Sequence, residues 1–265
     1  MAAPSLGLDH LMVLVRDLDA AAADYERLGF TVAPQMRHAG FGTANRIVLF
    51  GNNFIELVGI VAPAELHGPG FMIRDRLASH GPGPFGIALN AEDIVRDRDR
   101  LAAAGLAMGE IGGGSRPVPL PDGTTRLARF NTVVIGGPKE MPFVLFMSQQ
   151  HVPEVVWIEA WQRHANGATD LTGVTVAAAD PSAFRPLLTA LCGEAGVETT
   201  PAGLRARLPL GDIDIVSDAV AAKDHASPAN GEASRIIAVS LAAAAPRRRI
   251  AAAQAGGLIL DIGRA

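Results

Sequence analysis

Two polar residues stand inside otherwise apolar segments near the start of the chain. His10 lies within Leu8–Val15, and Glu56 lies within Phe54–Val58. Both segments are typical of strands, and a carboxylate inside a strand is costly unless a charge or a metal ion pairs with it. A neutral imidazole and a carboxylate are donors that Zn, Fe, Mn and Ni accept. The pair therefore indicates a metal site, and the alternative is that His10 is a core histidine satisfied by hydrogen bonds. Asp9 is expected on the opposite sheet face, because successive side chains of a strand alternate.

These strands belong to a pattern that recurs along the chain. Each of the first three copies has an apolar strand followed by an Asp placed to cap a helix, and in the first two a Gly ends that helix. The copies begin at Leu8–Val15, Pro84–Leu89, Leu171–Val176 and Arg235–Leu241. The expected helices span residues 18–28, 93–104, 181–191 and, in the last copy, Arg247–Gln254. Counted from the helix caps, positions 10, 86, 173 and 238 correspond.

Short strands separated by turn signals follow the first three helices, so the repeating unit is β-α-β-β-β, with a truncated fourth copy. This unit predicts an α+β protein. One helix for three or four strands leaves a sheet face bare, and paired units that curve their sheets around a shared cavity solve that problem. We expect residues 6–62 and 83–148 to form one such pair, and residues 149–168 to be a connecting segment. Residues 169–265 are expected to form a further, partly degenerate module pair.

The composition excludes several classes of protein. The 265 residues include 23 basic and 27 acidic side chains, and this net charge of −4 gives no sign of a nucleic-acid or membrane partner. Cys192 is the single cysteine, which excludes an internal disulfide and a multi-cysteine metal site. The N-terminus lacks the pattern of a secretion signal, and no stretch approaches the ~20 apolar residues of a membrane span. We therefore expect a soluble, cytoplasmic protein, and a homodimer is left open.

Several motifs resemble the glyoxalase-like members of the vicinal oxygen chelate superfamily. They are Leu8-Asp-His10, Leu28-Gly-Phe30, His38–Asn45, Phe54-Ile-Glu56, Gln150–Glu154 and Trp161–Gly167. The resemblance implies tandem modules around one cavity, with a divalent metal ion (Zn, Ni, Mn or Fe) held by the first and fourth strands of paired modules. His10 and Glu56 match the ligands of the first module. In the second module Gly86 and Leu145 hold these positions, and neither can bind a metal.

A third ligand must then come from outside the family pattern. His151 is the first candidate, because it ends a polar cluster that directly follows a buried strand. At about 3.3 Å per residue it stands about 20 Å beyond Leu145 along an extended strand, so it reaches the cavity only if the chain folds back after Ser148. His38, in a Gly-rich loop expected over the cavity mouth, is the second candidate. The alternative is that both histidines hydrogen-bond to backbone and shape a lid.

The expected function is that of a metal-assisted lyase or isomerase acting on a small oxygenated molecule. The metal ligands would be His10, Glu56 and His151, with Glu56 also catalytic and with His38 and Asn45 binding the substrate. The ion would bind adjacent substrate oxygens and stabilise an enolate-like charge. Two other functions stay open: a protein that binds a small molecule without catalysis, and an extradiol-type ring-cleaving dioxygenase that uses the same three ligands.

Overall fold

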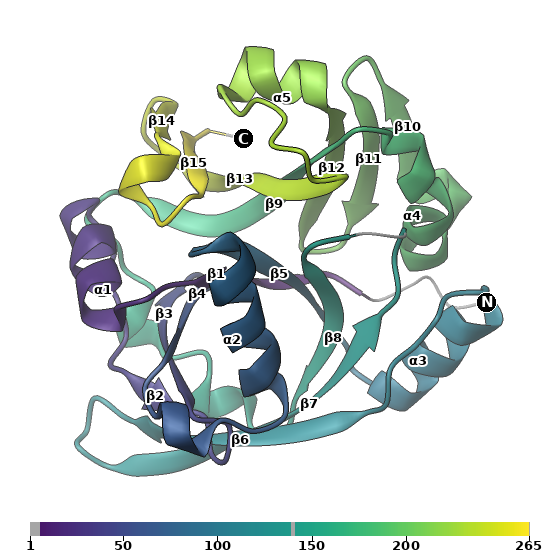
Figure 1. The fold of residues 1–265 in the computed structure, drawn as a ribbon. Helices are drawn as coiled ribbons and strands as arrows, with labels where there is room; N and C mark the ends of the chain where they lie inside the picture. Colours follow the sequence, from purple (N-terminus) through teal and green to yellow (C-terminus); the bar gives the residue numbers. More distant parts are fainter. Residues whose placement is uncertain (1–5, 139–140, 265) are drawn as a thin grey trace.

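The first half of the protein forms one strongly curved sheet of eight strands. The computed structural model describes residues 6–138 and 141–264. The strands pair in the order β2-β3-β4-β1-β5-β8-β7-β6 (Figure 1). Their bounds are β1 (Leu8–Leu14), β2 (Met36–Arg37), β3 (Thr43–Leu49), β4 (Phe54–Ile60), β5 (Gly83–Asn90), β6 (Gly112–Pro119), β7 (Thr125–Ile135) and β8 (Val144–Gln150). The sheet nearly closes on itself, because the backbone N–H of Ala39, just beyond β2, donates to the carbonyl of Ser115 in β6 at 3.0 Å.

The strand pairing confirms the tandem modules. Strands β1 and β5 lie antiparallel at the centre, and each is flanked by a parallel partner, β4 or β8. In this register Met12 faces Gly86 and His10 faces Ala88, so positions 10 and 86 are equivalent, as expected. Helices α1 (Leu18–Arg27) and α3 (Ile94–Ala103) follow the two strands, each with an Asp side chain capping its first turn.

The register corrects one expected match between the modules. Glu56 pairs with Met12, and the residue that pairs with the equivalent Ala88 is Phe146. Phe146, rather than Leu145, is therefore the counterpart of Glu56. Because strand side chains alternate, Leu145 points to the other face and lies in the main hydrophobic core. Neither Phe146 nor Gly86 can bind a metal, so the second module still lacks both family ligands.

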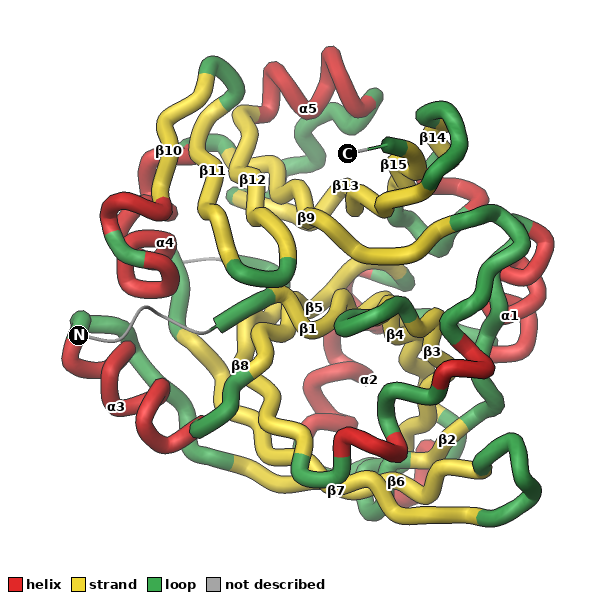
Figure 2. Tube along the Cα trace, turned by 180° about the vertical axis from the view of Figure 1, so that it is seen from behind, coloured by secondary structure: helices red, strands yellow, loops and turns green. Residues whose placement is uncertain are grey.

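The second half forms a separate seven-stranded sheet in the order β10-β11-β12-β9-β13-β15-β14. Its strands are β9 (Ala168–Ala178), β10 (Val197–Thr200), β11 (Gly203–Leu208), β12 (Gly211–Ser217), β13 (Ser234–Ala243), β14 (Arg248–Ile250) and β15 (Ile259–Gly263). Helix α4 (Arg185–Cys192) packs beside β11, and α5 (Asp218–His225) lies over the outer face (Figure 2). The central antiparallel pair β9–β13, flanked by parallel partners, repeats the plan of the first sheet.

The helix expected at Arg247–Gln254 is wrong. Strand β14 and a 3-10 turn at Ala252–Gln254 occupy this segment. Arg249 pairs with Asp261 of β15, and its guanidinium donates to both carboxylate oxygens at 2.7 and 2.8 Å. Such a paired fork is a strong contact, and together with the strand pairing it overrides the helix propensity of an Ala- and Arg-rich segment.

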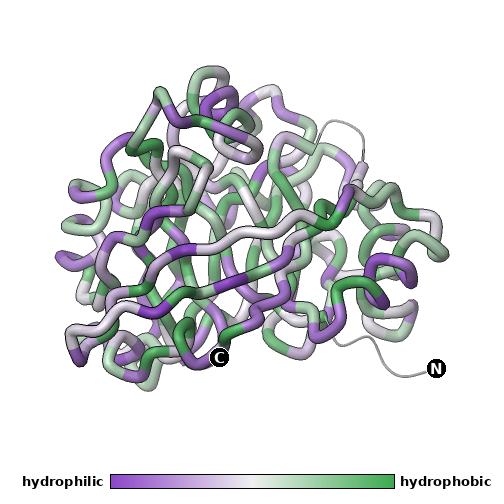
Figure 3. The backbone as a smooth tube through the Cα atoms, turned by 90° about the horizontal axis from the view of Figure 1, so that it is seen from below, coloured by the Kyte–Doolittle hydropathy of each residue, from purple (hydrophilic) through white to green (hydrophobic). Residues whose placement is uncertain are grey.

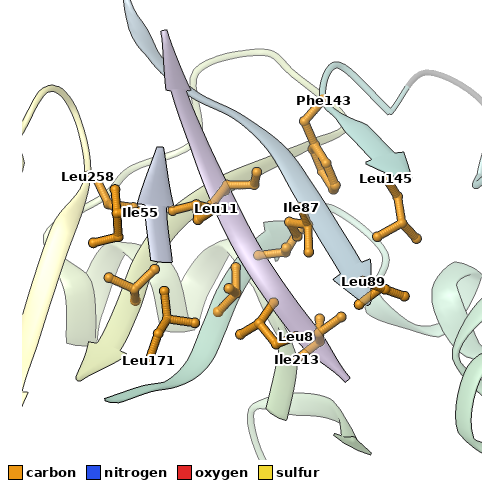
Figure 4. Close-up of a cluster of buried hydrophobic side chains, with 14 of the residues drawn as sticks. Leu8, Leu11, Ile55, Ile87, Leu89, Phe143, Leu145, Leu171, Ile213 and Leu258 are labelled. Atoms are coloured by element: carbon orange, nitrogen blue, oxygen red, sulfur yellow. The ribbon is translucent and has the colours of Figure 1, made fainter. Parts of the chain in front are cut away.

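The two sheets pack face to face through the largest hydrophobic cluster. Leu11, Ile55 and Ile87 of the first sheet meet Leu171 and Ile213 of the second (Figure 4).

Far from this interface between the sheets, the β6–β7 hairpin carries both hydrophilic and hydrophobic residues (Figure 3). One face of the first sheet is thus buried against the second sheet, which leaves its concave face to enclose a cavity.

Two segments outside the repeat close the concave side of the first sheet. Helix α2 (Pro69–His80) packs Ile73 and Leu77 against Leu14, Val58 and Phe85. At another part of the same side, residues 149–168 insert an apolar cluster that includes Val155, Val156 and Trp161. The connecting segment therefore joins the two halves and also fills part of the concave side of the first sheet. Among the described residues no helix is long and apolar enough to cross a membrane.

Candidate functional site

A cavity of about 290 Å³ lies between the concave face of the first sheet and helix α2. Most of its wall is apolar, with five phenylalanines among the lining residues: Phe41, Phe54, Phe85, Phe130 and Phe146. His10, His38 and Glu56 enter from the first module, and Arg116 enters from the second. An apolar cavity with a few polar side chains in its wall is the usual composition of a small-molecule site.

A β-bulge brings Asp9 and His10 together. Leu8 pairs with Leu89 and His10 pairs with Ala88, so β1 has one residue more than β5 at this point. The extra residue is Asp9, whose buried carboxylate accepts a hydrogen bond from Nδ1 of His10. The expectation that Asp9 points to the opposite face is wrong, because a bulge interrupts strand alternation. The bond fixes the imidazole with Nε2 free for another partner.

Glu56 lies next to the second ring nitrogen of His10. Nε2 of His10 lies 3.6 Å from Oε2 of Glu56, and the imidazole ring stacks on Phe54 with centroids 4.4 Å apart. Both side chains are buried and line the cavity. The structure therefore brings together the two residues that the sequence singled out.

Glu56 is held as a carboxylate. Asn45 donates from Nδ2 to Oε1 at 2.5 Å, and Nε2 of His38 lies 3.5 Å from the same oxygen. Burial by itself raises the pKa of Glu56, but the hydrogen bond from His38 and the positive charges of His10, His38 and Arg116 lower it to about 2. Glu56 is therefore ionised throughout the physiological pH range. Asn45 does not line the cavity and contacts Glu56 instead.

Of the two further histidines, His38 reaches this group and His151 does not. Nδ1 of His38 is 2.9 Å from the hydroxyl of Thr43, which directs Nε2 toward Glu56. His151 is exposed and lies outside the cavity lining. Strand β8 continues through Gln150, so the chain does not fold back after Ser148, and Gln150 takes the place at the cavity wall. The expected ligand role of His151 therefore finds no support in its position.

The donor types at Glu56 suit a divalent ion. Two ligands of one ion, each about 2.1 Å from it, are about 3–3.5 Å apart, and each histidine–glutamate pair is close to that spacing. The two imidazoles face different oxygens, however, and within the described part of the chain no three His, Cys, Asp or Glu side chains converge on one metal position. The residues fit an ion pairwise, with His10 and Glu56 the better-supported pair.

Arg116 is a cavity residue that none of the sequence motifs marks. It lies on β6, is only 4% exposed, and lines the cavity. Its Nε atom is buried without a hydrogen-bond partner, and its guanidinium carbon is 6.0 Å from the centre of the Phe130 ring. Burial lowers the pKa of Arg116, and the charges of Glu56 and Asp9 partly oppose this shift. One sequence signal indicates that Arg116 points inward. It stands two residues before the buried Val118, and residues two apart on a strand lie on the same face.

Paired modules around a cavity with a histidine on the first strand and a glutamate on the fourth define a vicinal oxygen chelate fold. A family model described as "Glyoxalase-like domain" matches residues 8–192, and the chain belongs to this family. This confirms the resemblance seen in the sequence motifs. A search of curated proteins finds no match.

Solved structures show the same fold at low sequence identity. A hypothetical protein from Staphylococcus aureus is 14% identical, covers 98% of this chain and 100% of its own, and has a TM-score of 0.73. A mutant of 4-hydroxymandelate synthase from Streptomyces coelicolor is 12% identical over 95% of this chain and 78% of its own, with a TM-score of 0.56. A fusion of a xylose isomerase-like TIM barrel with 4-hydroxyphenylpyruvate dioxygenase is 16% identical over 91% and 38%, with a TM-score of 0.54.

Proposed function

We propose that this protein is a metal-assisted enzyme, a lyase or isomerase, that acts on a small oxygenated molecule bound in the cavity. The observation that carries the proposal is the ionised Glu56, placed between the Nε2 atoms of His10 and His38 at 3.6 and 3.5 Å inside an apolar cavity. An ionised carboxylate in such surroundings needs positive charge, and a divalent ion supplies more of it than two imidazoles.

In this proposal His10 and Glu56 hold the ion, and ion binding draws in His38, now 3.5 Å from the other carboxylate oxygen, as the third ligand in place of His151. The ion would supply Lewis-acid stabilisation of the negative charge that develops on substrate oxygens. Asp9 accepts a hydrogen bond from Nδ1 of His10 and so directs Nε2 toward Glu56 and the ion. Asn45 holds the Glu56 carboxylate in place. The apolar wall excludes water and strengthens each electrostatic contact inside the cavity.

Metal retention tests the proposal directly. Purified protein is stripped with a chelator, loaded separately with Zn²⁺, Ni²⁺, Mn²⁺ or anaerobic Fe²⁺, desalted, and analysed by mass spectrometry for bound metal. We expect about one ion per chain in the wild type. We expect its loss in His10→Ala and Glu56→Gln, which each lack one of the two main ligands, and only weaker retention in His38→Ala, which keeps that pair.

His151→Ala is the matched control, since this histidine is exposed just beyond the end of β8 and does not line the cavity. It should retain the ion as the wild type does. Equal metal content in the wild type and Glu56→Gln would overturn the proposal, as would a wild type that retains none of the four ions. The second of these results, with a small molecule still bound, would favour a non-catalytic binding protein.

The donor types favour a second candidate, an Fe(II) oxygenase of the ring-cleaving dioxygenase type. Two imidazoles and one carboxylate are the ligand set of many non-haem Fe(II) oxygenases, and here they would be His10, His38 and Glu56. Two of the solved structures with this fold carry the names of a dioxygenase and of 4-hydroxymandelate synthase. Selective retention of Fe²⁺ with substrate-dependent oxygen consumption would support this candidate over a lyase or isomerase.

A further inference from the structure

Arg116 is a buried cation that the proposed chemistry leaves without a role. It is 4% exposed and lines the cavity, yet none of the ion pairs within 4.0 Å found among the described residues involves it. Its Nε atom has no hydrogen-bond partner. A buried guanidinium without a paired anion is destabilising, so the position indicates a partner that is not part of the chain.

The fold builds a firm place for this side chain. Gly114, two residues earlier on β6, leaves room for the Phe130 ring, since a Cβ at Gly114 would come within 2.5 Å of it. The guanidinium carbon lies 6.0 Å from the centre of that ring, a cation–π distance. The neighbouring Ser115 makes the bond to Ala39 that joins β6 to the loop of His38. Arg116 is thus fixed at the seam of the barrel, on the same cavity as Glu56.

The charges around the cavity favour an anionic ligand. Asp9 and Glu56 are the carboxylates whose charges act on Arg116, and neither contacts it. Each carboxylate already has nearer partners, because Asp9 is bonded to Nδ1 of His10 and Glu56 is bonded to Asn45 and lies beside two imidazoles. The guanidinium is therefore left without an anion of its own. A ligand with one negative charge would supply that anion, and the planar fork of an arginine matches a carboxylate with two parallel hydrogen bonds.

We propose that Arg116 binds the carboxylate of a small monocarboxylic acid whose apolar body lies among the phenylalanines of the cavity. The volume of about 290 Å³ requires a small ligand, since small-molecule sites range from about 300 to 1,000 Å³. This inference rests on the proposed function in one respect only: if the protein is an enzyme, the bound acid is its substrate. The anion site itself depends on Arg116 and not on a metal.

Binding of matched probes tests the assignment. Phenylacetate and its uncharged analogue phenylacetamide are titrated into chelator-treated protein by isothermal calorimetry and ligand-observed NMR. We expect phenylacetate to bind the wild type at least about tenfold more tightly than the amide, because a hydrogen bond to a charged group contributes more than a neutral one. Arg116→Gln should lose this preference, and Arg116→Lys should keep part of it, since it retains the charge without the fork.

Arg129→Gln is the control, because Arg129 is exposed on the neighbouring strand β7. It should bind phenylacetate as the wild type does. Equal affinity of the wild type for acid and amide, or unchanged acid binding in a folded Arg116→Gln, would overturn the assignment. Thermal melting checks the fold of each variant, and Arg116→Lys serves if the glutamine variant does not fold.

The two proposals fail separately. Loss of carboxylate binding in Arg116→Gln with unchanged metal content would support the anion site whatever the ion does. If the wild type binds phenylacetate through Arg116 but retains no metal, the anion site stands and the metal-assisted enzyme does not. If metal is retained and phenylacetate shows no dependence on Arg116, the anion site is wrong and the metal site stands.

Discussion

The carboxylate of Asp9 accepts a hydrogen bond from Nδ1 of His10, the residue that follows it in the same strand. Regular alternation would separate the two side chains by the thickness of the sheet, and the bulge at Asp9 brings them together. A histidine whose Nδ1 donates to a carboxylate has its ring orientation fixed and presents Nε2 to another partner, which is the arrangement found for many metal-binding histidines. The bulge therefore prepares His10 for the role that its distance to Glu56 suggests.

Asp9→Ala should weaken metal retention by about 10- to 100-fold without removing any ligand, because partners of this kind orient the ligating ring. Asp9→Asn keeps an acceptor oxygen and should have a smaller effect. Titration of the loaded protein with a competing chelator gives both affinities. Unchanged affinity in Asp9→Ala would mean that stacking on Phe54 alone orients His10.

The repeat could be predicted from the sequence because its signals are local. The Asp residues at positions 17 and 93 cap helices α1 and α3 as expected, and Gly29 and Gly105 follow the helix ends with φ of 87° and 89°. These conformations favour glycine, so the sequence marks them directly. Helix α2 begins at Pro69, directly after Gly68, and lacks a capping side chain, so the Asp signal that marks the start of the other two helices is missing.

The site depended on contacts that no local pattern encodes. The bulge at Asp9 follows from the register with β5, and the burial of Arg116 follows from the pairing of β6 with β7 and from the bond between Ser115 and the segment beyond β2. The preference for His151 over His38 assumed that the chain turns inward after Ser148, whereas pairing with β7 extends β8 to Gln150. Long-range strand pairing thus decides which polar side chains reach Glu56.

Asn53 joins the two sheets, and its loss should destabilise the protein. Its side chain donates to the carbonyl of Leu171 at 2.8 Å and accepts from the backbone N–H of Leu171 at 2.9 Å, with the residue 1% exposed. Asn53→Ala leaves two buried backbone groups unpaired, which should cost about 2–4 kcal/mol in the free energy of unfolding. Urea denaturation measures this change. Asn52→Ala, exposed in the same turn, should stay within about 0.5 kcal/mol of the wild type.

His164 should make stability depend on pH near neutrality. Its Nδ1 accepts from the backbone N–H of Thr31 and its Nε2 donates to the carbonyl of Leu49, both at 3.0 Å, so the neutral ring satisfies both partners. Burial lowers the pKa of His164, although the bond to Leu49 opposes the shift. Because the folded-state pKa is below the unfolded value of about 6.5, the unfolded chain binds the proton first.

The contribution of His164 is therefore fully present above about pH 6.5 and is lost as the pH falls toward the lowered folded-state pKa. His164→Gln cannot titrate, and its unfolding free energy isolates this effect from that of the other histidines. As the pH falls from about 7.5 to 5, the free energy of unfolding of the wild type should decrease relative to that of the variant. A difference that is constant over this range would show that protonated His164 fits the same contacts.

Arg116→Met should stabilise the ligand-free protein. Burial disfavours the charged guanidinium more than the charges of Glu56 and Asp9 favour it, as the lowered pKa of Arg116 indicates. Methionine fills a similar volume beside Phe130 and Val118 without a charge. Replacing a poorly compensated buried charge by an apolar side chain should gain about 1 kcal/mol in unfolding free energy, or about 2–4 °C in Tm for a domain of this size.

Arg129→Met, which changes an exposed arginine of β7, should leave Tm nearly unchanged and serves as the control. Saturating phenylacetate should raise the Tm of the wild type and not that of Arg116→Met, because only a ligand bound to the folded state stabilises it. If Arg116→Met instead lowers the Tm of the ligand-free protein, the guanidinium serves mainly to offset the charges of Glu56 and Asp9. We expect Arg116→Met to be more stable than the wild type and to show no rise in Tm with phenylacetate. This combination is typical of a residue that serves binding, since such residues commonly reduce stability.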